Sequence, residues 1–254
     1  MNSHIYRTIA GLLCVVALTP ADAADIKILT AGAFKQVVLE IVPQYEKESG
    51  NRVSVSNDTA GALKKRIEEG ESFDVAVITP AVLGELIAKG KIAAGTNVNV
   101  ACVSIGVVVR EGAAKPDIST VEAFKQALLA AKSVAYIDPA SGGSSGVYIE
   151  KLLGRLGIAD QIRPKARLKK GGHVADLVVS GEAELGLHQI SEIVPVKGAA
   201  LVGPLPEEIQ NRTTYAAAVS ASAANKVAAD ALIKMLSGPA GAAVLKSKGM
   251  EPAS

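Results

Sequence analysis

The chain alternates short runs of β-branched and small apolar residues with stretches whose apolar residues recur at helical spacing. Parallel strands need long crossover connections, which are usually helices, so this alternation predicts a parallel sheet. Helices then cover both faces of that sheet, and we expect an α/β fold. The expected strands are DIKIL (25–29), RVSVS (52–56), DVAVI (74–78), VSIGVVV (103–109), SVAYI (133–137), ELGLH (184–188), AALVG (199–203) and TYAAAV (214–219).

Capping residues mark where several helices begin and end. Thr59 and Thr79 each precede a helical pattern, and Pro80 suits a first helical position. Ser119 with Glu122 has the spacing of a capping box, in which each side chain satisfies a free backbone N–H. These signals predict helices directly after the second and third strands and before the fifth.

The N-terminus has the pattern of a secretory signal. Arg7 precedes the apolar run IAGLLCVVAL, and Ala21-Asp22-Ala23 is a suitable cleavage site. We therefore expect residues 1–23 to be removed and the mature protein to be periplasmic. A lipoprotein signal using Cys14 is a weaker alternative, because Leu13 is bulkier than the small residue expected before a lipidated cysteine.

Charge and cysteine content exclude several classes of partner and site. The 27 basic and 25 acidic residues leave a formal net charge of +2, and the chain has no Trp. This balance argues against nucleic acid or an anionic membrane as the partner. After removal of Cys14, Cys102 is the one remaining cysteine, which excludes an intramolecular disulfide and a cysteine metal cluster. We expect Cys102 to be a buried apolar residue and predict no cofactor.

The stretch DPASGGSSG (138–146) lies between an expected strand and an expected helix, and it matches the hydrolase pattern G-x-S-x-G. Ser144 would be the nucleophile, His173 or His188 its base, and Asp176 the orienting carboxylate. Two features argue against that alternative: five residues separate the strand from Ser144, and an HGGG-like oxyanion segment is missing. The phosphate-binding P-loop pattern is missing as well.

The same stretch is suited to holding an anion. Its backbone N–H groups lie at the positive end of a helix, beside the hydroxyls of Ser141, Ser144 and Ser145. A flexible connection with serine capping is the alternative interpretation.

Similar turns follow the first three expected strands. They are TAGAF (30–34), NDTA (57–60) and the turn at Thr79. Small residues at several strand-to-helix junctions form a crevice at the carboxyl ends of parallel strands, where open α/β sheets bind ligands. The repetition favours a shared binding crevice over unrelated caps.

These segments, in this order, resemble the periplasmic molybdate-binding proteins of ABC importers. That family shows a strand, an A-A-A-S-L turn, a helix, "YEKETG", a second strand, a serine-rich turn and L-x-x-Q/R-I-E-x-G-x-x-x-D-V. The resemblance covers essentially the whole mature chain. It rests on residues 24–78, IGVVVREG (105–112), DPASGGSSGVY (138–148), VVSGEAELGL (178–187) and LSGPAGAAVLKSKGME (236–251).

The resemblance implies a type II periplasmic binding fold: two lobes, each a mostly parallel sheet flanked by helices, joined by two crossover hinge strands. It places residues 24–106 and 214–254 in one lobe and 107–213 in the other. A small anion would bind between the lobes, and the closed form would be recognised by an importer's membrane permease. Such a protein is a monomer, binds no nucleic acid and catalyses nothing.

The family's ligand positions transfer to this chain with changes. Two serines that donate hydroxyls correspond to Ala33 and Ala60, with Thr59 beside the second. A hydroxyl lost from a buried oxyanion site costs about 1–3 kcal/mol. In the other lobe an alanine position holds Ser145, and the family's tyrosine falls at Gln189.

These changes suit a ligand larger or less symmetric than a tetrahedral oxyanion. Small organic carboxylates tolerate apolar walls such as Ala33 and Phe34 while accepting hydrogen bonds elsewhere. His188 is a candidate pH-sensitive donor, and Gly171 with the glycine after it maps to a backbone contact. Oxyanion and organic-acid receptors both stay open, and the Ser144 hydrolase is the third interpretation.

Three cationic side chains are candidates for neutralising a bound anion. Lys35, Lys64 and Arg110 fall near the expected ends of the crevice, whereas Lys169 and Lys170 are expected on a surface loop. Lysines on helices are mostly solvated, so solvent exposure is the alternative for each.

Overall fold

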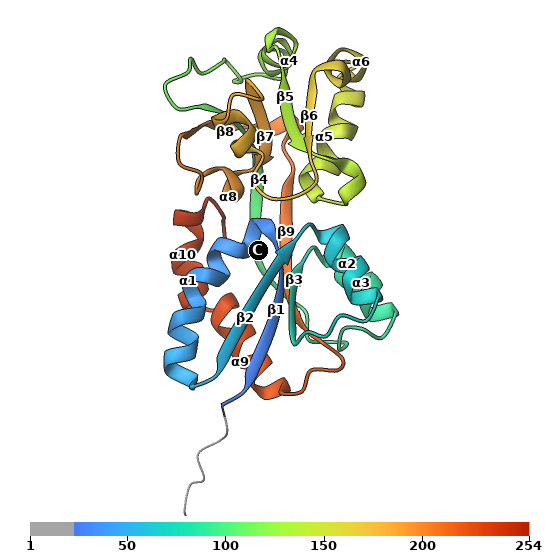
Figure 1. Ribbon diagram of the computed structural model, residues 1–254, viewed down its shortest axis with the longest axis vertical. Coiled ribbons are helices and arrows are strands. Elements are labelled where there is room, and N and C mark those ends of the chain that lie inside the picture. Colours follow the sequence, from blue (N-terminus) through green and yellow to red (C-terminus); the bar gives the residue numbers. More distant parts are fainter. Residues whose placement is uncertain (1–22, 254) are drawn as a thin grey trace, which may run out of the picture.

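The computed structural model describes residues 23–253, and Figure 1 shows two α/β lobes stacked along the long axis. The predicted signal peptide falls almost entirely on residues 1–22, outside the described residues. Strand order through both lobes is β2-β1-β3-β9-β4-β7-β5-β6, with β8 also pairing with β4. The predicted two-lobed α/β fold is confirmed.

The first lobe contains both ends of the described chain. Its parallel strands β1, β2 and β3 pair with one another, and β9 joins β3 to β4 in antiparallel fashion. The elements are β1 (Asp25–Ala31), α1 (Gly32–Ser49), β2 (Arg52–Asp58), α2 (Ala60–Glu68), β3 (Val75–Ile78), α3 (Pro80–Ala88), the first part of β4 (Val98–Arg110), β9 (Arg212–Val219), α9 (Lys226–Ser237), α10 (Pro239–Leu245) and the 3-10 turn η4 (Lys246–Lys248).

The second lobe is built from the middle of the chain. Strand β5 pairs in parallel with β6 and β7, while β7 and β8 both run antiparallel to β4. The elements are α4 (Val121–Ala130), β5 (Val134–Ile137), η1 (Pro139–Ser141), α5 (Ser144–Arg155), α6 (Ala159–Ile162), η2 (Arg163–Lys165), β6 (Ala166–Lys169), α7 (Ala175–Val179), β7 (Leu185–Gln189), α8 (Ile190–Ile193), β8 (Ala199–Pro204) and η3 (Glu207–Ile209).

Strand β4 is the first connection between the lobes. Its residues up to Ser104 pair with β9, and from Ile105 onward they pair with β7. The chain returns through residues 205–211, where Gln210 accepts a hydrogen bond from the Ile105 N–H at 2.9 Å. Two narrow connections side by side permit hinge motion between packed bodies.

Each lobe has its own apolar core. One large cluster fills the first lobe around Phe34, Leu63 and Leu232, and two smaller clusters fill the second around Phe124 and Val174. Strands β3 and β5 are buried at every residue, because helices cover both faces of the sheet. Separate cores allow each lobe to move as a rigid body.

Some local predictions were wrong. Thr120, rather than Ser119, caps α4 by accepting from the Ala123 N–H at 3.1 Å. Thr79 precedes α3, but its hydroxyl makes no capping bond. Cys102 is only partly buried, since its strand pairs at that point with the exposed C-terminal Glu251.

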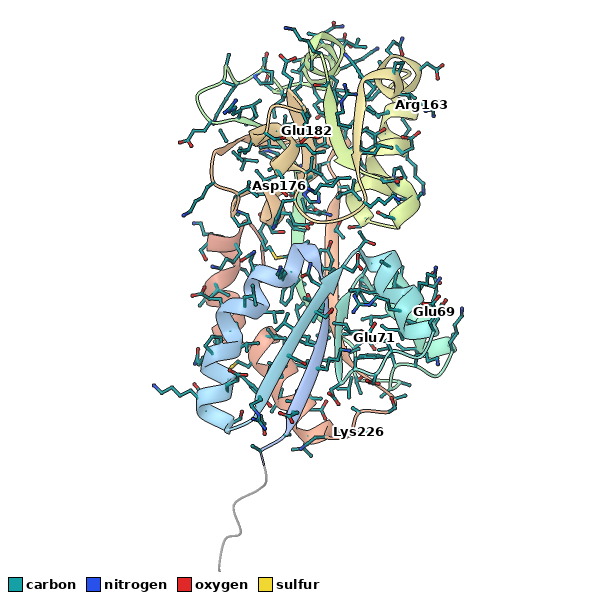
Figure 2. All side chains as sticks on the ribbon, viewed as in Figure 1. Glu69, Glu71, Arg163, Asp176, Glu182 and Lys226 are labelled. Carbon is teal, nitrogen blue, oxygen red and sulfur yellow. The ribbon has the colours of Figure 1, made fainter. Side chains whose placement is uncertain are left out.

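Charged side chains of both signs lie on the outside of both lobes (Figure 2). Glu69 and Lys226 are exposed on the first lobe, and Arg163 and Glu182 on the second. No single helix in residues 23–253 is long and apolar enough to cross a membrane. Helix α9 and the segment Pro239–Lys248 together have the required length and apolar composition, but they are bent relative to each other. The same range holds no group of three His, Cys, Asp or Glu residues placed to bind a metal ion.

Candidate functional site

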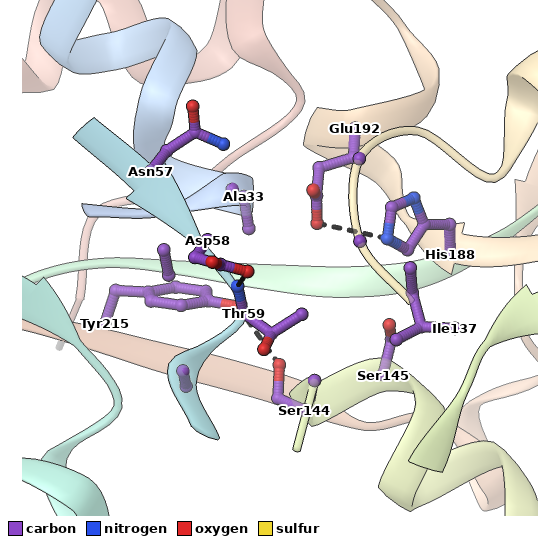
Figure 3. Close-up of a pocket in the computed structure, with 16 residues that line it drawn as sticks. Ala33, Asn57, Asp58, Thr59, Ile137, Ser144, Ser145, His188, Glu192 and Tyr215 are labelled. Carbon is purple, nitrogen blue, oxygen red and sulfur yellow. Dashed lines mark hydrogen bonds and ion pairs between the residues drawn. The ribbon is translucent and has the colours of Figure 1, made fainter. Parts of the chain in front are cut away.

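A cavity of about 30 Å³ lies between the two lobes. Its first wall comes from the first lobe and its second wall from the second lobe (Figure 3). The first wall consists of Ala31, Gly32, Ala33, Asn57, Asp58, Thr59, Ala60 and Tyr215. The second wall consists of Ile137, Gly143, Ser144, Ser145, Gly171, Gly172, His188 and Glu192. Direct contacts between the walls leave little free space, so the cleft is nearly closed.

The first wall presents two helix N-termini. Helix α1 begins at Gly32 directly after β1, and α2 begins at Ala60 after β2. Thr59 caps α2 by accepting from the Ala62 N–H at 3.2 Å. The first amides of a helix lack internal partners and carry partial positive charge, so this wall favours an anion.

The second wall adds a third helix N-terminus. Helix α5 begins at Ser144, directly after Gly143, and makes no side-chain capping bond. Ser145 is buried and lines the cavity. Gly143 is required here, because a Cβ at this position would lie 2.6 Å from Ile137 Cγ2.

Direct bonds hold the walls together. The Thr59 hydroxyl donates to the Ser141 carbonyl at 2.6 Å, and the Gly61 N–H donates to the Gly142 carbonyl at 3.1 Å. A Cβ on Gly61 would lie 2.7 Å from the Gly142 Cα. Two glycines therefore allow the lobes to approach backbone to backbone.

A polar network crosses from wall to wall beside these contacts. The Ser144 hydroxyl lies 3.1 Å from the Tyr215 hydroxyl, and the Gln189 amide donates to Ser144 at 3.3 Å and to Thr213 at 2.9 Å. Burial raises the pKa of Tyr215, so its hydroxyl keeps its proton. The network supplies neutral donors to the cleft.

A buried carboxyl and a buried imidazole meet in the second wall. His188, at the end of β7, places Nε2 3.2 Å from Oε2 of Glu192, one turn later in α8 (Figure 3). Burial raises the pKa of Glu192 to about 8 and lowers the pKa of His188 to about 3. Low-dielectric surroundings disfavour both charged forms, so the pair is neutral near pH 7.

Glu192 reaches across the cavity to the start of α1. Its Oε1 lies so close to Gly32 that any Cβ at that position would collide with it. Lys35, in the first turns of α1, lowers the pKa of Glu192, but burial has the larger effect. The carboxyl group therefore occupies the region where α1 would receive an anion.

Three buried polar side-chain atoms in the described residues have no hydrogen-bond partner. They are His188 Nδ1, Gln189 Oε1 and Ser191 Oγ. All three lie close to the junction between the end of β7 and the start of α8. Unsatisfied buried polar atoms are rare, and they gather at functional sites. Of these three residues His188 lines the cavity, which makes it a candidate for ligand chemistry.

The structure places most of the residues selected from the sequence around this cavity. Ala33, Thr59, Ala60, Ser144, Ser145, Gly171 and His188 line it. Ligand contact by each of them stays a prediction.

Four selected residues do not line the cavity. Phe34 is fully buried in the first core, because its side chain points to the sheet side of α1. Thr79 lines a separate surface cavity, Ser141 contributes its carbonyl to Thr59, and Gln189 acts through Ser144.

The expected cations are also mostly elsewhere. Lys64 forms ion pairs with Glu68 and Glu85 on the outer side of α2, and Arg110 is exposed at the end of β4 farthest from β9. Of the three, Lys35 acts on the cavity, because its charge lowers the pKa of the cavity-lining Glu192.

The structure does not assemble the serine hydrolase triad. The partners of Ser144 are Tyr215 and Gln189, not a histidine. His173 Nδ1 bonds the Glu192 carbonyl oxygen at 2.9 Å, and Asp176 pairs with Lys169 at 3.1 Å. Without a base at Ser144, the G-x-S-x-G match is a helix start.

Sequence reasoning missed Glu192 and Tyr215. Glu192 follows His188 by four residues, but β7 and α8 meet at a sharp junction that the pattern does not predict. Tyr215 lies in the expected strand 214–219, and its position beside Ser144 depends on closure of the lobes.

Comparison with known proteins identifies the family. The sequence profile of bacterial extracellular solute-binding proteins matches residues 26–251. An aconitate isomerase from Pseudomonas sp. is 34% identical, with 96% of each chain covered, and the molybdate-binding protein of Azotobacter vinelandii is 25% identical, with 98% of each covered.

Solved structures agree on the fold. The periplasmic molybdate-binding protein of Azotobacter vinelandii superposes with a TM-score of 0.75 at 20% identity, covering 90% of this chain and 100% of that one. A periplasmic thiamin-binding protein gives 0.73 at 16% identity, covering 91% of this chain and 84% of that one. The predicted resemblance to molybdate-binding proteins is confirmed, and the chain belongs to the family of bacterial extracellular solute-binding proteins.

Proposed function

We propose that the protein captures a small organic acid with two or three carboxylates between its lobes, as the periplasmic receptor of an ABC importer. One observation carries this proposal: three helix N-termini and an uncharged carboxyl group face the same closed cavity. Amide donors attract negative charge, and a protonated carboxyl donates one more hydrogen bond to a carboxylate.

An organic acid suits this cavity better than a tetrahedral oxyanion. Ala33 and Ala60 offer methyl groups where hydroxyl donors would hold an oxyanion, each loss being worth about 1–3 kcal/mol. Glu192 Oε1 already fills the space beside Gly32, where a tetrahedral oxyanion would meet the start of α1. The relative with 34% identity is named for an unsaturated tricarboxylate, aconitate, which supports the same class.

Binding requires the lobes to separate and close again. The Thr59–Ser141 and Gly61–Gly142 contacts bridge the cleft, so we expect the ligand to enter with these contacts broken. We propose residues 24–106 with 214–254 and residues 107–213 as the moving lobes. The expected motion is a hinge at Ser104–Ile105 and at residues 205–211.

The test is a ligand panel read by thermal unfolding and by titration calorimetry. It compares cis-aconitate, trans-aconitate, citrate and tricarballylate with molybdate, tungstate and sulfate. A ligand present at 100 times its Kd stabilises the folded state by about 2.7 kcal/mol, so binders raise the Tm clearly. The proposal fails if molybdate or sulfate raises the Tm and every organic acid leaves it unchanged.

A matched pair of variants locates the binding. Ala33→Asp places a second carboxylate at the start of α1 inside the cavity, so it should abolish binding of the acid. Ala113→Asp adds the same charge on an exposed loop and should bind as the parent does. Equal loss in both variants would contradict a site between the lobes.

A second candidate function is isomerisation of an unsaturated acid in the same cleft. The specific observation is the neutral Glu192–His188 pair, since a receptor needs no titratable group that changes charge near pH 8. The name of the aconitate isomerase relative favours it as well. Incubation of the protein with cis-aconitate, followed by quantification of trans-aconitate, distinguishes conversion from binding alone.

A further inference from the structure

The Glu192–His188 pair is the most unusual chemical feature of the cleft. His188 is 1% exposed and Glu192 is 8% exposed, and their side chains are joined at 3.2 Å. Burying a carboxyl and an imidazole costs free energy, which a simple anion receptor has no reason to bear. Such groups in a ligand cavity point to proton transfer.

The geometry gives the two residues different roles. Glu192 faces Gly32 across the cavity with Oε1, while Oε2 is held by His188 Nε2. When Glu192 is ionised, His188 carries its proton on Nε2 and donates it to Oε2, and Nδ1 stays unpaired. Glu192 therefore meets the ligand, and His188 orients Glu192 from behind.

Burial keeps the pair close to neutral, and charges on neighbouring elements modify its effect. Lys35 on α1 lowers the pKa of Glu192 against the effect of burial, while His173 before α7 and Lys169 at the end of β6 lower the pKa of His188 further. Tyr215 on β9 stays protonated close to Glu192. An acid whose pKa lies near the working pH both accepts and returns a proton.

We propose that Glu192 transfers a proton between two carbons of a bound unsaturated polycarboxylate, with His188 as its positioning residue. This rests on the proposed function, because the acid must first bind in the cleft. One ligand carboxylate would lie at the start of α1 or α2, and the carbon chain would lie against Glu192 Oε1.

The step is balanced without an oxidant or a cofactor. The reacting form is ionised Glu192, which is the minor form below pH 8. Its carboxylate forms an O–H bond with a hydrogen of the methylene next to the double bond, and the C–H electron pair becomes the new double bond. The former π pair moves to the far carbon as an enolate stabilised by its carboxylate. Glu192 then returns its proton to that carbon. One C–H bond breaks and one forms, and the double bond moves by one position, so a cis acid can leave as the trans acid.

The experiment follows cis-aconitate with the full mature chain by proton NMR in D₂O, and measures binding separately by calorimetry. The parent should convert cis- to trans-aconitate and incorporate deuterium. Glu192→Gln should bind the acid but lose conversion by about 100-fold or more, the usual range for a missing acid–base group. Glu208→Gln, which removes an exposed carboxylate on η3, should convert at the parental rate.

Positioning by His188 has its own readout. The rate at saturating ligand should rise with pH as Glu192 ionises, and His188→Gln should shift that profile along the pH axis with a smaller loss of rate. Glu192→Asp keeps a carboxylate at this position and should retain slow deuterium exchange into the acid. Activity in this variant would show that a substitution at residue 192 leaves the protein folded, so the loss of conversion in Glu192→Gln reports the missing carboxylate.

The outcomes separate the two proposals. Binding of aconitate without conversion by the parent overturns proton transfer and leaves the receptor function standing. Absence of aconitate binding overturns the proposed function itself. Conversion by Glu192→Gln within about threefold of the parent would assign the chemistry to another group.

Discussion

The two walls of the cleft differ in how they meet a ligand. The first wall offers backbone amides at the starts of α1 and α2, lined by the methyl groups of Ala33 and Ala60. The second wall offers side chains: the Ser144 and Ser145 hydroxyls and the Glu192–His188 pair. Backbone amides attract almost any anion, whereas placed side chains select one. The first wall therefore supplies attraction, and the second wall supplies discrimination.

The largest expected effect comes from restoring oxyanion donors to the first wall. Ala33→Ser with Ala60→Ser adds two hydroxyls that face the cavity. At about 1–3 kcal/mol for each new hydrogen bond, molybdate affinity should rise by roughly 2–6 kcal/mol. Titration calorimetry with molybdate measures it.

Ala113→Ser on the exposed loop is the control and should change nothing. Unchanged molybdate binding in the double variant would show that the second wall, not the missing hydroxyls, rejects the oxyanion.

The next effect concerns the stability cost of the second wall. An unperturbed glutamate carboxyl has a pKa of 4.5, and burial raises the pKa of Glu192 in the folded protein to about 8. The folded state therefore binds this proton more tightly, so the free energy of unfolding falls as pH rises from 4.5 to 8. Glu192→Gln removes the titration and should stabilise the protein at pH 7 by roughly 3 kcal/mol.

Urea unfolding of parent and variant at several pH values checks this prediction. The gap should be absent below the unperturbed pKa of 4.5, widen up to about 8 and stay constant above it. A constant gap at all pH values would mean that Glu192 is ionised normally.

The smallest effect tests one of the bonds that join the walls. Tyr215→Phe removes the hydroxyl that lies 3.1 Å from Ser144 in the other lobe. A neutral hydrogen bond contributes about 1 kcal/mol, so ligand affinity should fall about fivefold. Tyr45→Phe removes a bond to the Ala228 carbonyl within the first lobe and should lower stability instead of affinity. Calorimetry and thermal unfolding of both variants separate the two effects.

The fold followed from local patterns because strands such as 75–78 and 134–137 are continuous apolar runs that only a doubly covered sheet buries. Strand β6, with sequence ARLK, was missed because an edge strand is half exposed and lacks such a run. The cap at Thr120 was missed because Ser119 is an equally good cap by type.

The site was predicted less completely, and for a physical reason. Helix starts such as Ala33, Ala60 and Ser145 are local features, so the sequence located them. Glu192 reaches the cavity because Gly32 leaves room for it from the opposite lobe, and that depends on closure. Contacts between lobes leave no local signal in the chain.

The central claim is that a neutral Glu192 faces the bound acid, and proton uptake on binding tests it most directly. Titration calorimetry with trans-aconitate is run about half a pH unit above the Glu192 pKa of about 8, in two buffers that differ in ionisation enthalpy. The difference in binding enthalpy between the buffers gives the number of protons taken up with the ligand. Free Glu192 is roughly three-quarters ionised at that pH, so the account predicts an uptake of about 0.75 proton for the parent and none for Glu192→Gln. Binding with no uptake by the parent, or with the same uptake in both proteins, would contradict it.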